Sequence, residues 1–200
     1  MEKHRQAQSK EGKTSAVRDR ILATASKLFY KNGVHAVGVD LVVAQSGVAK
    51  TSLYRHFGNK DALVAAFLEA EDADFWRQWD AIAEAHSNDP EGEIEAYLDW
   101  MDVRLRRPGY RGCPQLNVVA ELVDPKHPAR RIAIEHKERM HLRLSEIARR
   151  LDLPHPKRVG AQLALAFDGA FMSAPLGAGE PMARTLRDTV HLLLKASRTN

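Results

Sequence analysis

Apolar positions recur at intervals of three and four residues along almost the whole chain, which is the spacing of amphipathic α-helices. The first such stripe consists of Val17, Ile21, Ala25, Leu28 and Phe29. Ser15 can cap the start of this helix, and the pair Asn32-Gly33 can end it. The strict alternation that predicts β-strands is nearly absent, so the pattern predicts an all-α fold.

Glycine, proline and capping residues divide the rest of the pattern into further helices. We expect these at 39–46, 50–57, 60–86, 92–106, 114–122, 128–151, 157–173 and 181–197, about nine helices in all. The expected organisation is a disordered basic arm over 1–14, a three-helix DNA-binding domain over 15–62, and a larger helical ligand-binding and dimerisation domain over 63–200.

The segment 39–57 has the spacing of a helix-turn-helix. Two short helices that cross steeply need a turn residue that tolerates positive φ, and Gly47 supplies it. The apolar residues expected to bury the inner faces of both helices are Val42, Val43, Val48, Leu53 and Phe57. Two ordinary core helices joined by a glycine would have the same residue pattern, so the turn alone leaves both interpretations open.

The second of these helices leaves polar residues for solvent. We expect Lys50, Thr51, Ser52, Tyr54, Arg55 and His56 to be exposed. A helix that enters the major groove presents its N-terminal residues to base edges while their neighbours touch phosphates. Lys60 stands at the positive end of the next helix, where backbone N–H groups favour an anion. Arg55 fits a DNA contact and an ion pair within the protein equally well.

Charge is distributed unevenly between the two parts of the chain. The first sixty residues carry eleven Lys or Arg and four acids, a net charge of +7, while the other residues sum to −3. A basic segment on a slightly acidic body is typical of proteins that bind a polyanion.

The string from 18 to 63 resembles the N-terminal domain of the tetracycline-repressor (TetR) family. The matching positions are Ile21-Leu22, Ala25, Leu28-Phe29, Gly33, Gly47-Val48, Lys50, Leu53-Tyr54-Arg55-His56-Phe57, Lys60 and Ala62-Leu63. The resemblance implies three DNA-binding helices, a dimer made through the last two helices, and repression that a small ligand releases. It also places Tyr54 and Lys60 where the family holds phosphates.

Three positions depart from the family pattern. Gly38 stands where a Thr usually caps the second helix, Ala49 where a Ser usually caps the recognition helix, and Val43 where a small Ala is common. Loss of a capping hydroxyl to Ala costs about 1 kcal/mol, whereas Gly at a cap costs a few tenths. These departures concern the operator sequence and local stability rather than the fold.

The last two expected helices, 157–173 and 181–197, suit a dimer interface. The first is apolar on all sides with small residues interspersed, and such a helix is covered on more than one face. Two helices from each of two subunits would form a four-helix interface about a two-fold axis. That symmetry would set two recognition helices in successive major grooves, on near-palindromic half-sites about 34–36 Å apart. Burial within a monomer is the alternative.

Candidate effector-binding residues lie in the larger domain. They are Trp76, Trp79, Trp100, Cys113, Leu116, Met140 and Phe171, each of which also fits an ordinary core position. Cys113 is the only cysteine, at the start of a helix beside Arg111. That setting would make an exposed thiol reactive, so Cys113 is a sensor, a residue of the ligand site, or core. No acidic or basic cluster in the sequence indicates the charge of the effector, so the effector is not identified.

The sequence gives little support for a metal site or a dinucleotide-binding site. His127, Asp124, His136 and His141 lack the spacing of a helical metal site, and Gly177-Ala-Gly179 lacks the third glycine of a dinucleotide fingerprint. We therefore expect no enzyme, no cofactor and no metal. The polar N-terminal residues do not resemble a secretory signal, and no uninterrupted apolar run reaches the ~18–20 residues of a membrane span. Together with the single cysteine, this predicts a cytoplasmic protein.

Two interpretations of function remain. The first is a dimeric, ligand-responsive transcriptional repressor that binds a near-palindromic operator, although activation would look the same in sequence. The second is a helical small-molecule-binding protein or enzyme whose basic end is incidental. Phosphate-based binding weakens steeply with salt, whereas a buried ligand site is nearly insensitive to it, so salt dependence separates the two.

Overall fold

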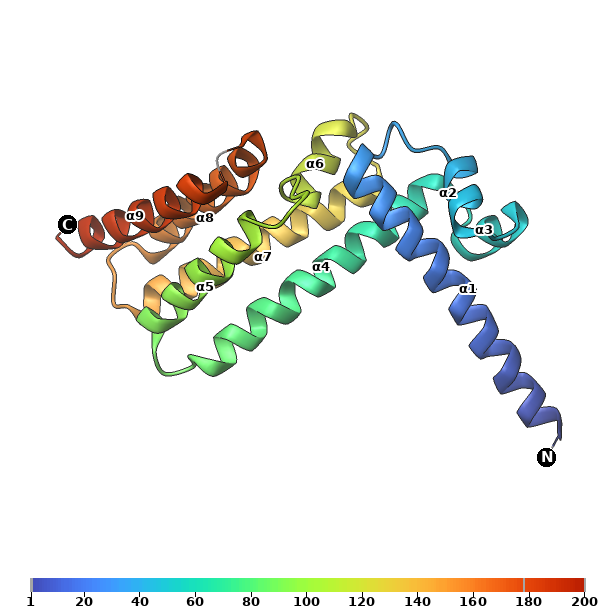
Figure 1. Cartoon of the computed structure of the whole chain (residues 1–200). Coiled ribbons are helices and arrows are strands. Elements are labelled where there is room, and N and C mark those ends of the chain that lie inside the picture. Colours follow the sequence, from blue (N-terminus) through green and yellow to red (C-terminus); the bar gives the residue numbers. More distant parts are fainter. Residues whose placement is uncertain (1, 178, 200) are drawn as a thin grey trace. The chain divides into compact units, whose positions relative to one another are not determined.

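The computed structural model describes the backbone of residues 2–177 and 179–199, and the side chains of 16–177 and 181–199. Within these residues all regular structure is helical (Figure 1). The helices are α1 (Glu2–Asn32), α2 (Val39–Ser46), α3 (Lys50–Phe57), α4 (Lys60–Ala85), α5 (Pro90–Leu105), α6 (Pro114–Glu121), α7 (Pro128–Arg150), α8 (Pro156–Ser173), the 3-10 turn η1 (Ala174–Leu176) and α9 (Gly179–Arg198). The predicted all-α class is confirmed.

Most helix boundaries agree with the sequence prediction to within two residues, and α1 is the exception. Its backbone is helical from Glu2, so the start predicted at Ser15 is corrected. The side chains of 1–15 lie outside the described part, and the expected disordered arm over 1–14 stays a prediction. The turn η1 was not predicted, because Pro175 within the segment 174–176 indicated a loop.

The helices form two compact units. The first comprises 1–70 and 118–132, and the second comprises 71–117 and 133–200. Three helices, α4, α6 and α7, therefore supply residues to both units. In the first unit, α1 buries Ile21, Ala25, Leu28 and Phe29 and packs on α2 and α3. The predicted boundary at residue 62 stays a prediction.

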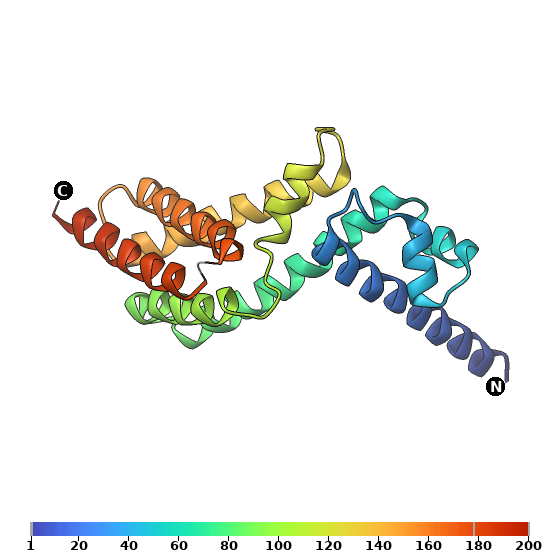
Figure 2. The ribbon, with the colours of Figure 1, turned by 45° about the horizontal axis from the view of Figure 1, so that its top comes forward.

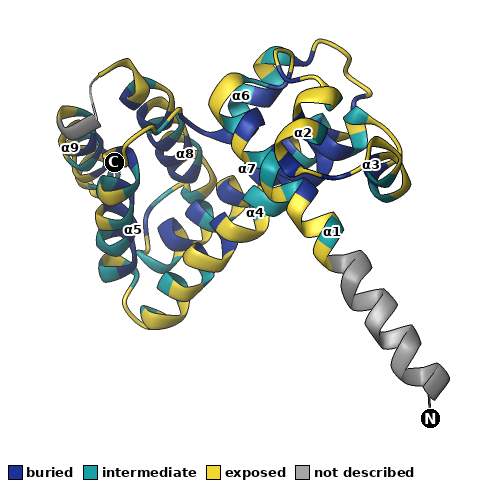
Figure 3. Cartoon of the chain, turned by 45° about the vertical axis from the view of Figure 1, so that its right-hand side comes forward, coloured by how far each residue is buried: buried dark blue, intermediate teal, exposed yellow. Residues whose placement is uncertain are grey.

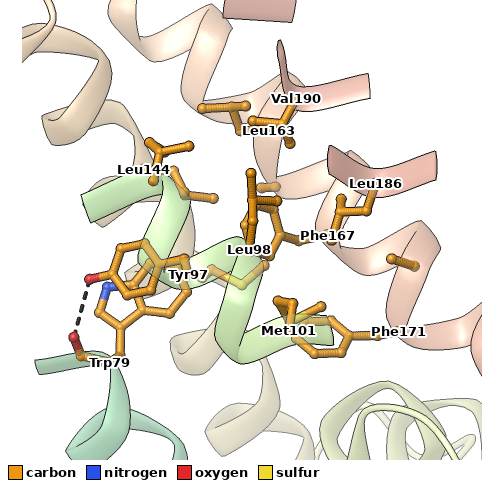
Figure 4. Packing of buried hydrophobic residues seen from close by; sticks show 14 of the residues in the cluster. Trp79, Tyr97, Leu98, Met101, Leu144, Leu163, Phe167, Phe171, Leu186 and Val190 are labelled. Atoms are coloured by element: carbon orange, nitrogen blue, oxygen red, sulfur yellow. Dashed lines mark hydrogen bonds between the residues drawn. The ribbon is translucent and has the colours of Figure 1, made fainter. Parts of the chain in front are cut away.

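The second unit is built around one continuous apolar core. Aromatic residues of α4 and α5 meet the leucines and phenylalanines of α8 and α9 (Figure 4). Trp79 stacks on Tyr97 with ring centroids 4.0 Å apart, and the Tyr97 hydroxyl donates to the Trp79 carbonyl at 3.1 Å. Helices α8 and α9 lie side by side, and α9 also packs on α5 (Figure 2).

Helices α7 and α8 approach each other closely at Gly160. A Cβ at this position would lie 2.2 Å from Ser145 Oγ and 2.6 Å from the Ser145 backbone nitrogen. Because the obstruction includes backbone, we expect Gly160→Ala to lower the free energy of unfolding by about 1–3 kcal/mol, despite the better helix propensity of alanine. Urea titration would measure this, with exposed Lys157→Ala as the control that changes stability little. An unchanged or higher stability of Gly160→Ala would contradict the close approach.

Candidate functional site

The turn between α2 and α3 has the conformation that the sequence predicts. Gly47 adopts φ +64°, in the left-handed region that favours glycine, and its N–H donates to the Val43 carbonyl at 3.1 Å. Neither Gly38 nor Ala49 contributes a side-chain hydrogen bond to the helix that follows it. Helices α2 and α3 therefore begin without a side-chain cap.

Apolar residues anchor one side of α3 to the first unit. Leu53 and Phe57 of α3 are buried, as are Val42 of α2 and Val48 of the turn, while Val43 is only half-buried. The Arg18 guanidinium lies over the Phe57 ring, 5.2 Å from its centroid. Leu53 and Phe57 are one helical turn apart, so the opposite side of α3 faces solvent (Figure 3).

Four polar side chains occupy that solvent-facing side of α3. Lys50, Thr51, Tyr54 and Arg55 are exposed. Ser52 and His56 were expected to be exposed too, but both are half-buried. The His56 Nε2 atom is buried with no hydrogen-bond partner. The expectation of full exposure is thus wrong for these two residues.

An ion pair links the recognition helix to α2. Lys50 Nζ lies 2.6 Å from Asp40 Oδ1, and both side chains are largely exposed. The hydrogen bond to Asp40 and its negative charge raise the pKa of Lys50. Arg55 makes a long hydrogen bond to Ser52 Oγ of its own helix, 3.5 Å from Nη2. The solvent-facing side of α3 therefore carries two cations and two neutral polar groups, with the Asp40 carboxylate at its edge.

Helix α4 begins three residues after the end of α3. The Asn59 side chain accepts the Ala62 backbone N–H at 2.8 Å and thereby caps α4. Lys60 opens the helix and is half-buried. Its charge therefore lies at the end of α4 that carries the helix's positive partial charge.

A long-range contact that no sequence pattern predicts holds the loop between α1 and α2. The Glu121 carboxylate, at the end of α6, accepts the His35 backbone N–H at 2.9 Å, and its carbonyl oxygen lies 2.7 Å from His35 Nε2. Arg130 of α7 donates to the Val119 carbonyl at 3.2 Å. His35 and Glu121 are 86 positions apart, so no local pattern signals their contact.

The residues predicted for effector binding do come together in the second unit. Trp76, Trp79, Cys113, Met140 and Phe171 belong to its buried core, and Trp100 and Leu116 are half-buried against it. The Cys113 side chain is buried, and its thiol lies 3.8 Å from Gln115 Oε1. The sensor interpretation required an exposed thiol, and this condition is not met.

The histidines weighed as metal ligands make other contacts. His136 Nδ1 lies 2.6 Å from Asp72 Oδ1, and burial lowers the pKa of His136 although Asp72 opposes that shift. His127 Nε2 lies 3.3 Å from Asp61. Among the described residues there is no group of three or more His, Cys, Asp or Glu that could hold a metal ion.

Helices α8 and α9 leave apolar side chains in solvent. Leu165 of α8 is 76% exposed, Leu192 of α9 is 67% exposed, and Leu176 of η1 is 84% exposed. The stretch Pro156–Leu176 is long and apolar enough to cross a membrane, by length and composition only. The core helix of a soluble protein has the same length and composition, so this feature is weak evidence for a membrane span.

Comparisons with known proteins identify the family. Residues 21–67 match the profile of bacterial regulatory proteins of the tetR family. The fold is similar to the crystal structure of SCO4454, a TetR-family transcriptional regulator from Streptomyces coelicolor, with a TM-score of 0.87 and 33% identity over 92% of this chain and 96% of that one. A TetR transcriptional regulator from Streptomyces avermitilis matches with a TM-score of 0.71 and 32% identity over 88% of this chain and 98% of that chain.

The chain therefore belongs to the TetR family of DNA-binding transcriptional regulators, and the resemblance noted in the sequence is confirmed. Proteins of this family regulate transcription and are generally not enzymes. Curated relatives match over a shorter stretch. QacR, a regulator from Staphylococcus aureus, is 36% identical over 63 residues, which are 32% of this chain and 34% of QacR. The matched stretch thus spans about a third of that relative's length.

Proposed function

We propose that this chain is a cytoplasmic, homodimeric repressor that binds a near-palindromic operator and is released from it by a small-molecule effector. The observation that carries the proposal is the solvent-facing side of α3, where Lys50, Thr51, Tyr54 and Arg55 stand on a helix anchored by Leu53 and Phe57. Such a helix can enter a major groove without loss of its core contacts. Family membership supports DNA binding, dimerisation and effector control.

Each DNA contact has a proposed role. Lys50, Thr51 and Arg55 would reach base edges or flanking phosphates, and Tyr54 and Lys60 would hold phosphates. Ser52 and His56 are half-buried, so their part in recognition would be at the edge of the contact. The dimer would form through 157–173 and 181–197, whose exposed leucines a second copy would cover.

Fluorescence anisotropy of labelled upstream DNA tests the proposal. Selective, salt-sensitive binding is expected, and Tyr54→Ala should weaken it roughly tenfold, since one hydrogen bond to a charged phosphate contributes about 1.5 kcal/mol. Arg149→Ala is the matched control, because Arg149 is an exposed cation of the second unit paired with Glu146 on its own helix. If neither upstream DNA nor duplexes selected from a random pool bind selectively, the chain is a helical ligand-binding protein instead.

Asp40 should limit binding to non-specific DNA. Asp40→Asn removes a carboxylate beside the proposed DNA contact and frees Lys50 to neutralise a phosphate. Each phosphate neutralised steepens the dependence of log K on log salt by about 0.9. We therefore expect Asp40→Asn to bind random duplex more tightly and with a steeper salt dependence, in anisotropy titrations at three salt concentrations. Equal salt slopes for wild type and Asp40→Asn would show that Lys50 already contacts a phosphate or never does.

A further inference from the structure

Arg18 is a cation of α1 that lies beside the recognition helix. Its guanidinium carbon is 5.2 Å from the centroid of the Phe57 ring, and its side chain is exposed. Helix α1 packs on α3, so this contact joins two helices of the first unit. Among the described residues, Arg18 has no ion pair with a carboxylate. Its charge is therefore held beside α3 and is free for an anion from outside the chain.

Phe57 lies at the border between the buried and the solvent-facing sides of α3. Successive residues of an α-helix are separated by about 100° around its axis. Leu53 therefore lies about 40° to one side of Phe57. On the other side, Lys50 lies about 20° away and Tyr54 about 60° away. Leu53 is buried, whereas Lys50 and Tyr54 are exposed. Arg18 consequently flanks the solvent-facing side of α3 at the edge that carries Tyr54.

The same end of α3 turns directly into α4. The Asn59 backbone N–H donates to the Phe57 carbonyl at 2.8 Å, and α4 begins at Lys60. Residues three apart on a helix have Cβ atoms about 5–6 Å apart, so Phe57 and Tyr54 are neighbours on the surface of α3. Arg18 therefore lies at the end of α3 from which both proposed phosphate contacts, Tyr54 and Lys60, extend.

The Phe57 ring can prepare the Arg18 guanidinium for an anion. A cation over an aromatic face is attracted by the negative quadrupole of the ring. This attraction restricts the side chain, while the N–H donors of the planar guanidinium remain available at its edges. A guanidinium can donate two parallel hydrogen bonds to one phosphate. Because the side chain is restricted before it binds, less conformational entropy is lost when the phosphate arrives.

We infer that Arg18 binds a phosphate of the DNA backbone next to the proposed Tyr54 contact, and that Phe57 positions it there. This inference rests on the proposed function, since it adds α1 to a DNA contact that otherwise consists of α3 and the start of α4. A phosphate carries no information about the base, so Arg18 contributes equally to the affinity for operator and for other DNA.

Anisotropy titrations of the full chain test the inference, with the upstream duplex and a random-sequence duplex at three salt concentrations each. Arg18→Met should weaken binding to both duplexes by a similar factor, roughly tenfold, because a hydrogen bond to a charged group is lost. It should also reduce the slope of log K against log salt by about 0.9, because one phosphate fewer is neutralised. Arg18→Lys should keep the slope but lose part of the affinity, since lysine lacks the planar guanidinium.

Arg20→Met is the matched control for Arg18→Met. Arg20 is an exposed arginine of the same helix. It lies about 200° around the axis of α1 from Arg18, and therefore on the side that faces away from α3. Both variants change the net charge of the chain by the same amount. Arg20→Met should leave the salt slope unchanged for both duplexes.

Phe57→Leu tests the positioning role of the ring. The variant keeps an apolar residue at the end of α3 but removes the aromatic face. It should weaken DNA binding in the wild-type background and have a smaller effect in the Arg18→Met background, because the ring acts through that guanidinium. Equal effects in the two backgrounds would refute the positioning role.

The outcomes separate this inference from the proposed function. Equal salt slopes for wild type and Arg18→Met would overturn it, as would an equal loss of slope with Arg20→Met. If Arg18→Met does not fold, as its melting curve would show, Arg18→Gln takes its place in the comparison. A wild-type chain that binds neither duplex at low salt would refute DNA binding itself. Binding with a salt slope that does not depend on Arg18 would refute only this inference.

Discussion

Arg150→Met should lower the free energy of unfolding by about 3–5 kcal/mol, because it leaves a buried carboxylate without its cation. Glu93 is 2% exposed, and Arg150 Nη1 is its only cationic partner among the described contacts. Arg150 Nη2 donates to the carbonyls of His86 at 3.1 Å and Ser87 at 2.9 Å. One side chain of α7 therefore holds both the loop after α4 and the start of α5.

The neighbouring residue supplies the control. Arg149 is exposed and pairs with Glu146 on its own helix, so Arg149→Met should change stability by less than about 1 kcal/mol. Denaturant titration followed by circular dichroism measures both variants. Adding Glu93→Gln to Arg150→Met should recover part of the loss, since the amide carries no charge to desolvate. Equal effects of the two arginine variants would show that Glu93 is not an isolated buried charge in the folded chain.

Leu165→Asp combined with Leu192→Asp should dissociate the proposed dimer. Both leucines are exposed in the single chain, on α8 and α9. A carboxylate at each position would be buried against its symmetry mate, and like charges juxtaposed in an interface cost several kcal/mol. A monomer engages only one half-site, so operator affinity should fall by about a hundredfold or more, which corresponds to roughly 3 kcal/mol.

Light scattering after size-exclusion chromatography measures the mass, and anisotropy measures operator affinity. Leu142→Asp is the matched control, because Leu142 is 70% exposed but belongs to α7. It should leave mass and operator affinity unchanged. A dimer that survives the α8 and α9 changes but is lost with Leu142→Asp would place the interface on α7 instead.

The sequence predicted the helices well because local signals define their ends. Gly47 needs its positive φ, Asn59 caps α4, and prolines open α5, α6, α7 and α8. Exposure along α3 was predicted less well. The polar character of Ser52 and His56 predicted that both face solvent, whereas both are half-buried in the folded chain. The direction of each side chain around the helix, and not its polarity, decides its exposure.

The interactions that the sequence could not predict join residues far apart in the chain. The contacts of Glu121 with His35 and of Arg150 with Glu93 depend on which helices become neighbours. Likewise the aromatic residues of α4 and α5 could be recognised as core or ligand candidates from composition. That Arg104 lies over Phe75, Arg139 over Trp76 and Lys137 over Phe171 follows only from the packing of α4, α5, α7 and α8.

The first unit is discontinuous in sequence, since it takes 118–132 as well as 1–70. A chimeric regulator made by joining residues 1–70 of this chain to a relative's remaining helices would carry the donor's α3 but lose Glu121, which holds the His35 loop. Transplanting operator specificity between relatives therefore requires a two-segment graft, or a recipient that already has a carboxylate at the corresponding end of α6. The same dependence restricts which recombination events within the family can give a folded protein, because a single crossover after residue 70 separates two segments that fold together.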